Sequence, residues 1–368
     1  MSNHRLVFVG TYTGPIRFGT GKILDGKGKG IYVYKLDVSS GAMEQCSIAE
    51  GAPNPSYLAF DPSHRFLYAV NELKEFEGAS TGAVSAFSME PDSGKLKFLN
   101  MKSSHGTDPC HLTVDRTGRY VLVANFMSGS VCVLPIREDG SLGDATDVVQ
   151  HRGSSVDPVR QSGPHAHAVT LDDTGRYAFV PDLGIDKLTV YAFDADRGKL
   201  EPNDEAWIEV TPGAGPRQLV MHPRGRYAYL INELDSTMMA FRYDRDRGNL
   251  REIQTLSTLP DGFKGASTCA EVQISPSGRF LYGSNRGHDS IVMYVINQKD
   301  GVLTCIGHVS TQGKTPRSFS VDPAGDFLLA ANQDTDNVVT FRLDPASGEL
   351  VATGHSADVP TPVCVKVM

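Results

Sequence analysis

Long hydrophobic runs are missing from this sequence of 368 residues. Its N-terminal region offers only the short apolar stretch Leu6-Val7-Phe8-Val9 with no small-residue cleavage site, and no later segment approaches the length of a membrane-spanning helix. These absences argue against a secretion signal and a membrane anchor. We therefore expect a cytoplasmic protein with no membrane partner.

Paired cysteines and an excess of positive charge are missing as well. The six cysteines are scattered without a Cys-x-x-Cys pair or zinc spacing, so we expect reduced, mostly buried thiols and no metal. Acidic residues (43) outnumber lysine plus arginine (35), and the net charge of −8 argues against a nucleic-acid partner. An anionic substrate would therefore need a local cluster of arginines.

The sequence does contain an internal repeat. Six segments with two apolar runs around a turn of the type Asp/His/Ser-Pro-x-Gly-Arg recur about every 50 residues. The matching turn residues are His64, Gly118, Gly175, Gly225, Gly278 and Gly325. A second turn, typical of β-hairpins, closes seven times on glycine, at Gly41, Gly94, Gly140, Gly198, Gly248, Gly301 and Gly348.

The two termini explain why one signal occurs six times and the other seven times. The segment "RLVFVGTYTG" at Arg5 matches the second strand of a repeat, whereas "PTPVCVKVM" at Pro360 matches a first strand. One unit is thus split between the termini, which closes a ring and leaves no free sheet edge. We predict an all-β, single-domain protein over residues 1–368, a seven-bladed β-propeller with four-stranded antiparallel blades.

Comparison of the repeats separates residues that all repeats share, which we attribute to the fold, from residues that vary among the repeats, which are candidates for a site. The shared turn is predicted to be structural, and so are five asparagines expected to bond backbone within their blades: Asn71, Asn125, Asn232, Asn285 and Asn332. Two rings of variable residues are expected to meet in one pocket at the channel mouth. The first ring is Ser56, Cys110, His167, Arg217, Ala270, Arg317 and Val363, followed by Tyr57, His111, Ala168, Gln218, Glu271, Ser318 and Cys364; the second is Tyr12, Glu72, Phe126, Asp182, Glu233, Arg286 and Gln333.

Charged residues gather in neighbouring repeats of these rings. Arg217 and Glu233 belong to one repeat, Glu271 and Arg286 to the next, and Arg317 to the one after that. Taken singly, each pair is more simply interpreted as an interblade salt bridge. As a cluster with histidine, they favour a site that acts on an anionic substrate.

Two histidines in "GPHAHAV", His165 and His167, open the third of the six repeats. This repeat carries about two extra residues before its first strand, so we expect His165 on the rim and His167 at the channel position. We favour His167 slightly as the base. Together with Asp182 the histidines do not complete a metal-ligand set.

A glycine-rich segment near the N-terminus, "TGPIRFGTGKILDGKGKG", carries Arg17, Lys22, Lys27 and Lys29. It is not a Walker A loop, because no Gly-Lys-Ser/Thr ends the required spacing. One interpretation is a lid that covers the channel mouth and attracts phosphate. A flexible surface loop is the interpretation we favour.

Five motifs together resemble the lactonase family of seven-bladed propellers over essentially the whole chain: "GTYTG", "RQSGPHAHAV", "GPRQLVMHPRGRYAYLINEL", "EVQISPSGRFLYGSNRG" and "TPRSFSVDP". The resemblance implies opening or closure of a lactone without a metal or organic cofactor. It also implies that the catalytic residues are His165 or His167, Arg217, Glu233 and Arg286, with Arg160 in a further family motif. Gln218 and Phe126 depart from the histidine and tyrosine expected at their positions.

The expected function is hydrolysis of an anionic sugar-acid lactone, with 6-phosphogluconolactone as the leading substrate. The predicted substrate-binding residues are Arg160, Arg317, Glu271, Gln218 and His111. Two alternatives stay open: a muconate-type lactonizing cycloisomerase and a noncatalytic binding scaffold. A Ser/His/Asp hydrolase is disfavoured because no Gly-x-Ser-x-Gly motif is present. We expect a monomer or a weak homodimer.

Overall fold

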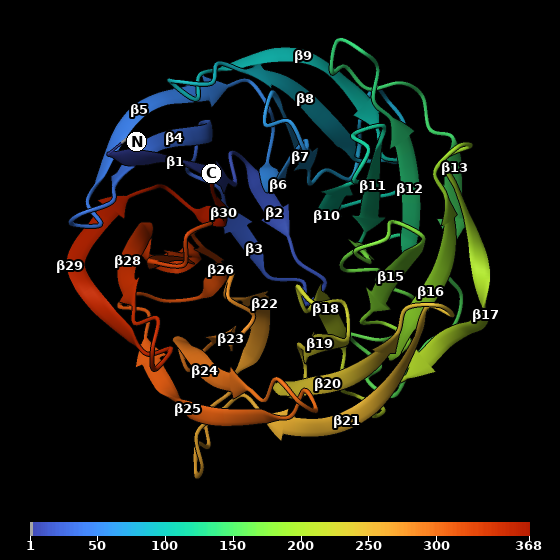
Figure 1. Cartoon of the computed structure of the whole chain (residues 1–368). Coiled ribbons are helices and arrows are strands. Elements are labelled where there is room, and N and C mark those ends of the chain that lie inside the picture. The colour runs from blue at the N-terminus through green and yellow to red at the C-terminus, as the bar shows by residue number, and fades with distance from the viewer. Residues whose placement is uncertain (1–2) are drawn as a thin grey trace.

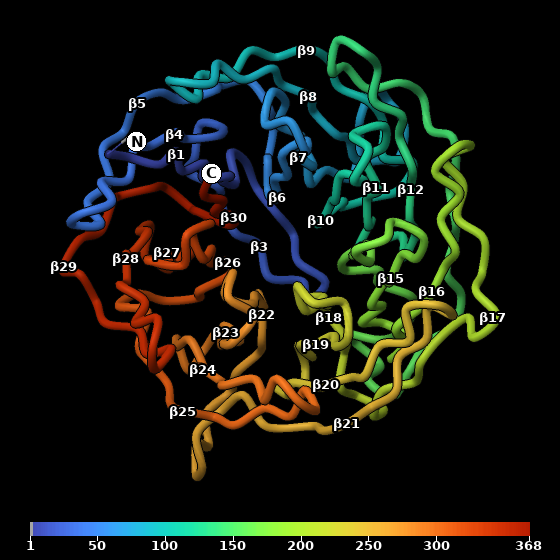
Figure 2. Tube along the Cα trace, in the orientation of Figure 1, coloured from blue at the N-terminus to red at the C-terminus, as the bar shows by residue number. Residues whose placement is uncertain are grey.

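Seven four-stranded antiparallel sheets stand around a central channel and account for nearly all the regular structure (Figure 1). The computed structural model describes residues 3–368. This arrangement is the predicted seven-bladed β-propeller, and Figure 2 follows the chain from blade to blade around the ring. No helix in the described residues is long and apolar enough to cross a membrane.

Each blade contributes one strand to each of four concentric positions. The innermost strands are β30 (Pro362–Val367), β6 (Pro55–Phe60), β10 (Pro109–Val114), β14 (Thr170–Leu171), β18 (Pro216–Met221), β22 (Thr268–Ile274) and β26 (Pro316–Val321). The second strands are β1 (His4–Thr11), β7 (Phe66–Asn71), β11 (Tyr120–Asn125), β15 (Tyr177–Asp182), β19 (Tyr227–Asn232), β23 (Phe280–Arg286) and β27 (Phe327–Asn332). The third strands are β4 (Gly30–Asp37), β8 (Ala83–Met89), β12 (Ser130–Pro135), β16 (Lys187–Asp194), β20 (Thr237–Asp244), β24 (Ser290–Ile296) and β28 (Asn337–Leu343). The outermost strands are β5 (Met43–Glu50), β9 (Leu96–Ser103), β13 (Asp147–Gln150), β17 (Lys199–Glu209), β21 (Asn249–Ser257), β25 (Leu303–Ser310) and β29 (Leu350–Asp358).

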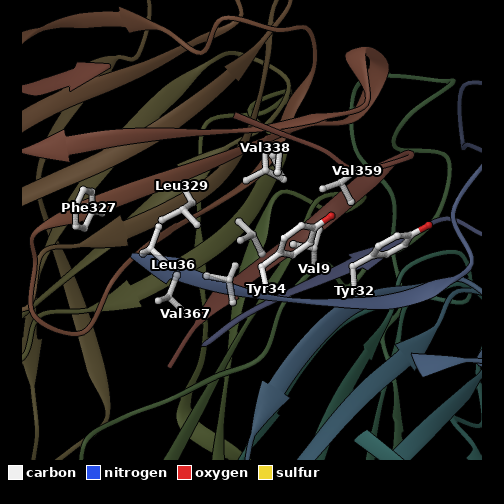
Figure 3. Packing of buried hydrophobic residues seen from close by; sticks show 13 residues of the cluster. Val9, Tyr32, Tyr34, Leu36, Phe327, Leu329, Val338, Val359 and Val367 are labelled. Atoms are coloured by element: carbon white, nitrogen blue, oxygen red, sulfur yellow. The ribbon is translucent and has the colours of Figure 1, made fainter. Parts of the chain in front are cut away.

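The ring closes through the blade that combines both termini, as the split repeat predicted. Strand β30 pairs antiparallel with β1, with Val367 opposite Val7 and Val365 opposite Val9. Apolar side chains of this blade and of the last blade pack into one buried cluster, which includes Tyr34 and Leu329 (Figure 3). Hydrogen bonding and burial of apolar surface therefore both hold the ends of the chain together.

The repeated turn joins the first and second strands at the same end of six blades; in the seventh blade these two strands, β30 and β1, come from opposite ends of the chain. In the fourth blade, Asp172 accepts hydrogen bonds from the backbone N–H groups of Arg176 and Tyr177, at 2.9 and 3.0 Å. Gly175 in this turn has φ of 73°, a left-handed conformation that glycine adopts without steric cost. The turn motif is therefore explained by local backbone geometry, as predicted.

The repeated asparagines lie at the other end of the second strands. Four of the five donate from Nδ2 to backbone carbonyls, as Asn125 does to Ser104 at 2.9 Å. The accepting carbonyls follow the outer strand of the preceding blade, so the expectation of bonds within one blade was wrong. Asn232 instead donates to the hydroxyl of Thr237 at 2.8 Å. These asparagines mostly tie neighbouring blades together.

The innermost strand of the fourth blade is irregular. Strand β14 contains only Thr170 and Leu171, and before it a single isolated bridge joins Ala166 to Asp182. The extra residues of this repeat lie in the irregular segment, which carries both histidines of "GPHAHAV". The two side chains can therefore face different directions instead of sharing one strand face.

A two-stranded hairpin outside the blades lies across the centre of the ring (Figure 1). It consists of β2 (Pro15–Arg17) and β3 (Ile23–Asp25), and the remaining element is the short 3-10 helix η1 (Gln333–Thr335). Ile16 packs in a small apolar cluster with Tyr12 and Val363, and Phe18 and Leu24 lie against it. The segment favoured as a flexible surface loop is thus a packed hairpin over the channel.

Candidate active site

A cavity of about 320 Å³ lies at the end of the channel that the hairpin covers. Both variable rings contribute to its wall, as predicted. The lining residues from the rings are Cys110, His167, Arg317, Glu72, Phe126, Glu233, Arg286 and Gln333. Arg160, Asp108, Asp334 and the hairpin residues Arg17, Phe18 and Lys22 also line the wall.

Glu233 is the centre of a buried charge cluster in this wall. It lies just after β19, and its carboxylate accepts hydrogen bonds from Arg217 Nε at 3.0 Å, Arg286 at 2.8 Å and Arg160 at 2.6 Å. Although burial alone raises the pKa of Glu233, the guanidinium groups of Arg286, Arg160 and Arg217 hold it well below its usual range. Three cations around one carboxylate leave the cluster with net positive charge, which suits an anionic ligand.

His167 faces this cluster from the irregular segment of the fourth blade. Its Nε2 lies 3.8 Å from Glu233 Oε2, and its Nδ1 lies 3.5 Å from the sulfur of Cys110. Burial, reinforced by the positive charge of Arg217, lowers the pKa of His167 well below the usual value. The imidazole is therefore neutral at physiological pH and can accept a proton.

His165 lies behind the cavity wall. Its ring stacks on Phe126 with centroids 4.6 Å apart, and its Nδ1 is 2.9 Å from the carbonyl oxygen of Phe126. Its backbone N–H donates to Asp182, whose carboxylate also contacts His151 at 2.6 Å. The structure therefore places His165 in a buried support for the segment and not on the expected rim, whereas His167 reaches the cavity.

Arg317, unlike Arg160 and Arg286, has no carboxylate bound to it. Its guanidinium lies 5.7 Å from the ring centroid of Tyr12 and 5.6 Å from that of Phe18. Within residues 3–368 it makes no hydrogen bond or ion pair. Arg286 Nε is likewise a buried donor without a partner among these residues. Both side chains keep donors available for a ligand.

Four predicted site residues lie deeper in the channel than the main cavity. Beyond His167 the channel narrows to a second cavity of about 10 Å³, which has room for roughly one water molecule. In this region Gln218 donates to Glu271 at 2.8 Å and Arg217 bonds the carbonyl of Ala270. The predicted residues around it are His111, Arg217, Gln218 and Glu271. They support the floor of the main cavity and do not line it.

Asp108 is a cavity residue that the sequence analysis missed. Burial raises the pKa of its carboxyl to about 6, although a hydrogen bond from Lys74 opposes the shift. Its φ of 50° matches those of Asn54 and Thr315, which occupy the same position before a proline in other blades. The shared backbone position hid the difference in side chain, since only this blade has a carboxylate there.

The chain matches the family model described as lactonase, seven-bladed beta-propeller, over residues 6–367. It is 37% identical to a 6-phosphogluconolactonase of Bacillus subtilis (strain 168), with 98% of this chain and 97% of that protein covered. A 6-phosphogluconolactonase of Formosa agariphila is 34% identical over 80% of this chain and 82% of that protein. The solved structure of the periplasmic gluconolactonase PpgL of Pseudomonas aeruginosa has a TM-score of 0.90 at 35% identity, covering 99% of each chain.

Fold and site together define a propeller with a charged, histidine-containing cavity at one end of its channel. The family match over residues 6–367 and the identities above 30% show which family of propellers this is. The chain belongs to the lactonase family of seven-bladed β-propellers.

Proposed function

We propose that this protein is a lactonase that hydrolyses a sugar-acid lactone, and that 6-phosphogluconolactone is its substrate. The observation that carries the proposal is the neutral His167 beside unpaired guanidinium donors in one cavity. The names of the relatives in Bacillus subtilis and Formosa agariphila support this substrate. We also propose that the protein acts in the cytoplasm.

In the first step, His167 removes a proton from a water molecule that attacks the lactone carbonyl carbon. We assign the imidazole proton to Nδ1, which faces Cys110, so that Nε2 is free to accept. The C=O electron pair moves onto oxygen, and Arg286 and Arg317 donate hydrogen bonds to that oxyanion. General-base assistance of this type contributes about 10² to 10⁴ in rate.

In the second step, the tetrahedral intermediate collapses and the bond to the ring oxygen breaks. The imidazolium of His167 returns its proton to the departing alkoxide, which gives a hydroxy acid and regenerates the neutral base. Glu233 touches the arginines and not the reacting atoms, so we assign it the role of positioning them. Arg217, which lines the narrow second cavity, in turn positions Glu233 through their ion pair.

The first experiment measures acid release from 6-phosphogluconolactone by chelator-treated protein. We expect turnover well above the spontaneous rate, a loss of about 10²-fold or more in His167→Ala, and a smaller loss in His165→Ala. His165→Ala is the matched control because it removes the same side chain two residues away. Loss in His165→Ala alone would contradict the assigned base. Turnover of a muconate without any lactone hydrolysis would favour the cycloisomerase.

A further inference from the structure

The hairpin brings unused positive charge to the rim of the cavity. Its turn follows β2, with the Phe18 N–H bonded to the Lys22 carbonyl at 2.9 Å and the Gly21 N–H to the Phe18 carbonyl at 2.8 Å. Arg17 and Lys22 flank this turn and both line the cavity. Among the described residues Arg17 makes no side-chain hydrogen bond or ion pair, and Lys22 has only a loose contact of 3.9 Å with Asp334.

The hairpin is held in place across the mouth. Phe18 lies edge-on to Tyr12, with ring centroids 6.2 Å apart, and both rings face the Arg317 guanidinium. At the tip, a Cβ atom on Gly19 would lie 3.6 Å from the Phe126 ring, so the turn reaches the third blade. Lys27 on the return segment pairs with Asp336 at 2.6 Å. These contacts hold the hairpin, and with it the backbone of Arg17 and Lys22, over the cavity.

The cations at the rim differ from the cations around Glu233 in whether a carboxylate is bound to them. The arginines that contact Glu233 share its carboxylate, whereas Arg17 has no carboxylate partner among the described residues. His167, Arg17 and Lys22 line one cavity, so a lactone whose carbonyl lies at His167 can direct a substituent remote from that carbonyl toward the two cations. The guanidinium group of an arginine and the ammonium group of a lysine at the rim are suited to bind a phosphate dianion.

We propose that Arg17 and Lys22 of the β2–β3 hairpin form a phosphate subsite that makes this enzyme prefer a phosphorylated sugar lactone to its unphosphorylated form. This inference rests on the proposed lactonase function and adds the group that the hairpin recognises. The neighbouring Asp334 competes with the phosphate for Lys22. The subsite contributes to substrate binding and takes no part in bond breaking.

The test compares 6-phosphogluconolactone with glucono-δ-lactone in the wild-type protein and in Arg17→Gln/Lys22→Gln. We expect kcat/KM for the phosphorylated lactone to fall about 10- to 100-fold, mainly through KM, because two charge-assisted contacts are lost. For glucono-δ-lactone we expect a change of less than about two-fold. Asp334→Asn should lower KM for the phosphorylated lactone alone. Added salt should raise that KM in the wild type more than in the double variant.

Two single variants serve as controls, and each removes one positive charge outside the proposed subsite. Lys29→Gln removes an exposed lysine of the same segment that does not line the cavity, and Arg116→Gln removes an arginine at the opposite end of the channel. Neither should change the preference between the two lactones. Equal losses for both lactones in the double variant, or an unchanged preference, would overturn the phosphate subsite.

Failure of the proposed function is recognised separately. If the wild type hydrolyses neither lactone, the lactonase assignment falls, and calorimetric titration with 6-phosphogluconate and gluconate still tests the subsite. Tighter binding of 6-phosphogluconate that disappears in Arg17→Gln/Lys22→Gln would support it. Equal binding of the two acids by the wild type would refute it.

Discussion

The two ends of the channel are built from the same strands, but one end stabilises the blades and the other forms the candidate active site. At one end, the turns between first and second strands repeat an acidic or polar cap and a left-handed residue, as Asp172 and Gly175 show. At the other end, the corresponding positions hold His167, Glu233 and Arg317 in a single cavity. Uniform positions satisfy the backbone of each blade, whereas the positions that differ supply the chemistry.

The difference has an energetic side. The uniform end stabilises each blade through local hydrogen bonds that use the side chain of the turn itself. At the variable end, three arginines are buried against one carboxylate. Removing these charges from water costs free energy, and their mutual attraction offsets that cost only while every partner is present. Substitutions at the two ends should therefore separate loss of stability from loss of turnover.

The largest effect is expected from Glu233→Gln. Removing this charge leaves Arg160, Arg217 and Arg286 without their shared partner, so we expect a loss of about 3 to 5 kcal/mol in the free energy of unfolding. The arginines also lose their positions, and kcat/KM should fall at least as steeply as in His167→Ala. Denaturant titration and lactone kinetics measure the two effects. Retained turnover in a stable variant would refute the positioning role of Glu233.

A smaller and purely structural effect is expected from Asp172→Ala at the uniform end. The variant leaves backbone N–H groups of the turn without their acceptor and removes the contact to Tyr243, at 3.0 Å. We expect a loss of about 1 to 3 kcal/mol in the free energy of unfolding, with kcat unchanged for the folded protein. Asp115→Ala, in the same turn of the third blade, should behave alike. A loss of kcat in only one of these two variants would contradict the purely structural role of the turns.

The smallest expected effect is a shift of the pH profile. Burial and the charge of Arg217 lower the pKa of His167, so the base is neutral above that pKa and is lost as pH falls through it. We expect kcat/KM, corrected for spontaneous hydrolysis, to be flat between about pH 6.5 and 8 and to fall at lower pH. Arg217→Gln should move this fall to higher pH, because a cation that opposes protonation is gone.

The control for this profile is Asp108→Asn. The carboxyl of Asp108 lines the same cavity, and burial raises its pKa to about 6, so it is a second group that titrates on the acid side of neutrality. If the acid limb persists in Asp108→Asn and moves in Arg217→Gln, it belongs to His167. A limb that disappears in Asp108→Asn would assign it to the carboxyl instead.

Repetition made most of the fold predictable. Seven hairpin turns, six copies of the Gly118-type turn and the split terminal unit follow from local sequence, because each blade repeats the same backbone requirements. The same repetition nominated His167, Glu233, Arg286 and Arg317 by their differences, and all four line the cavity. The family motifs agree with this selection.

Depth and direction within the channel could not be predicted in the same way. His165 packs behind Phe126, and Gln218 lies at the floor, although both were nominated beside residues of the cavity wall. Neighbouring residues in an irregular segment or on adjacent strand faces point to different places, and packing decides which of them reach the cavity.

The sequence by itself determined the seven blades, the closure through the termini and the set of charged residues that differ among repeats. Only the tertiary structure decided that the glycine-rich segment crosses the mouth and that Arg17 and His167 line one cavity. Local periodicity encodes strands and turns, whereas the place of the hairpin depends on apolar contacts of Ile16 and Phe18 with residues far apart in the chain.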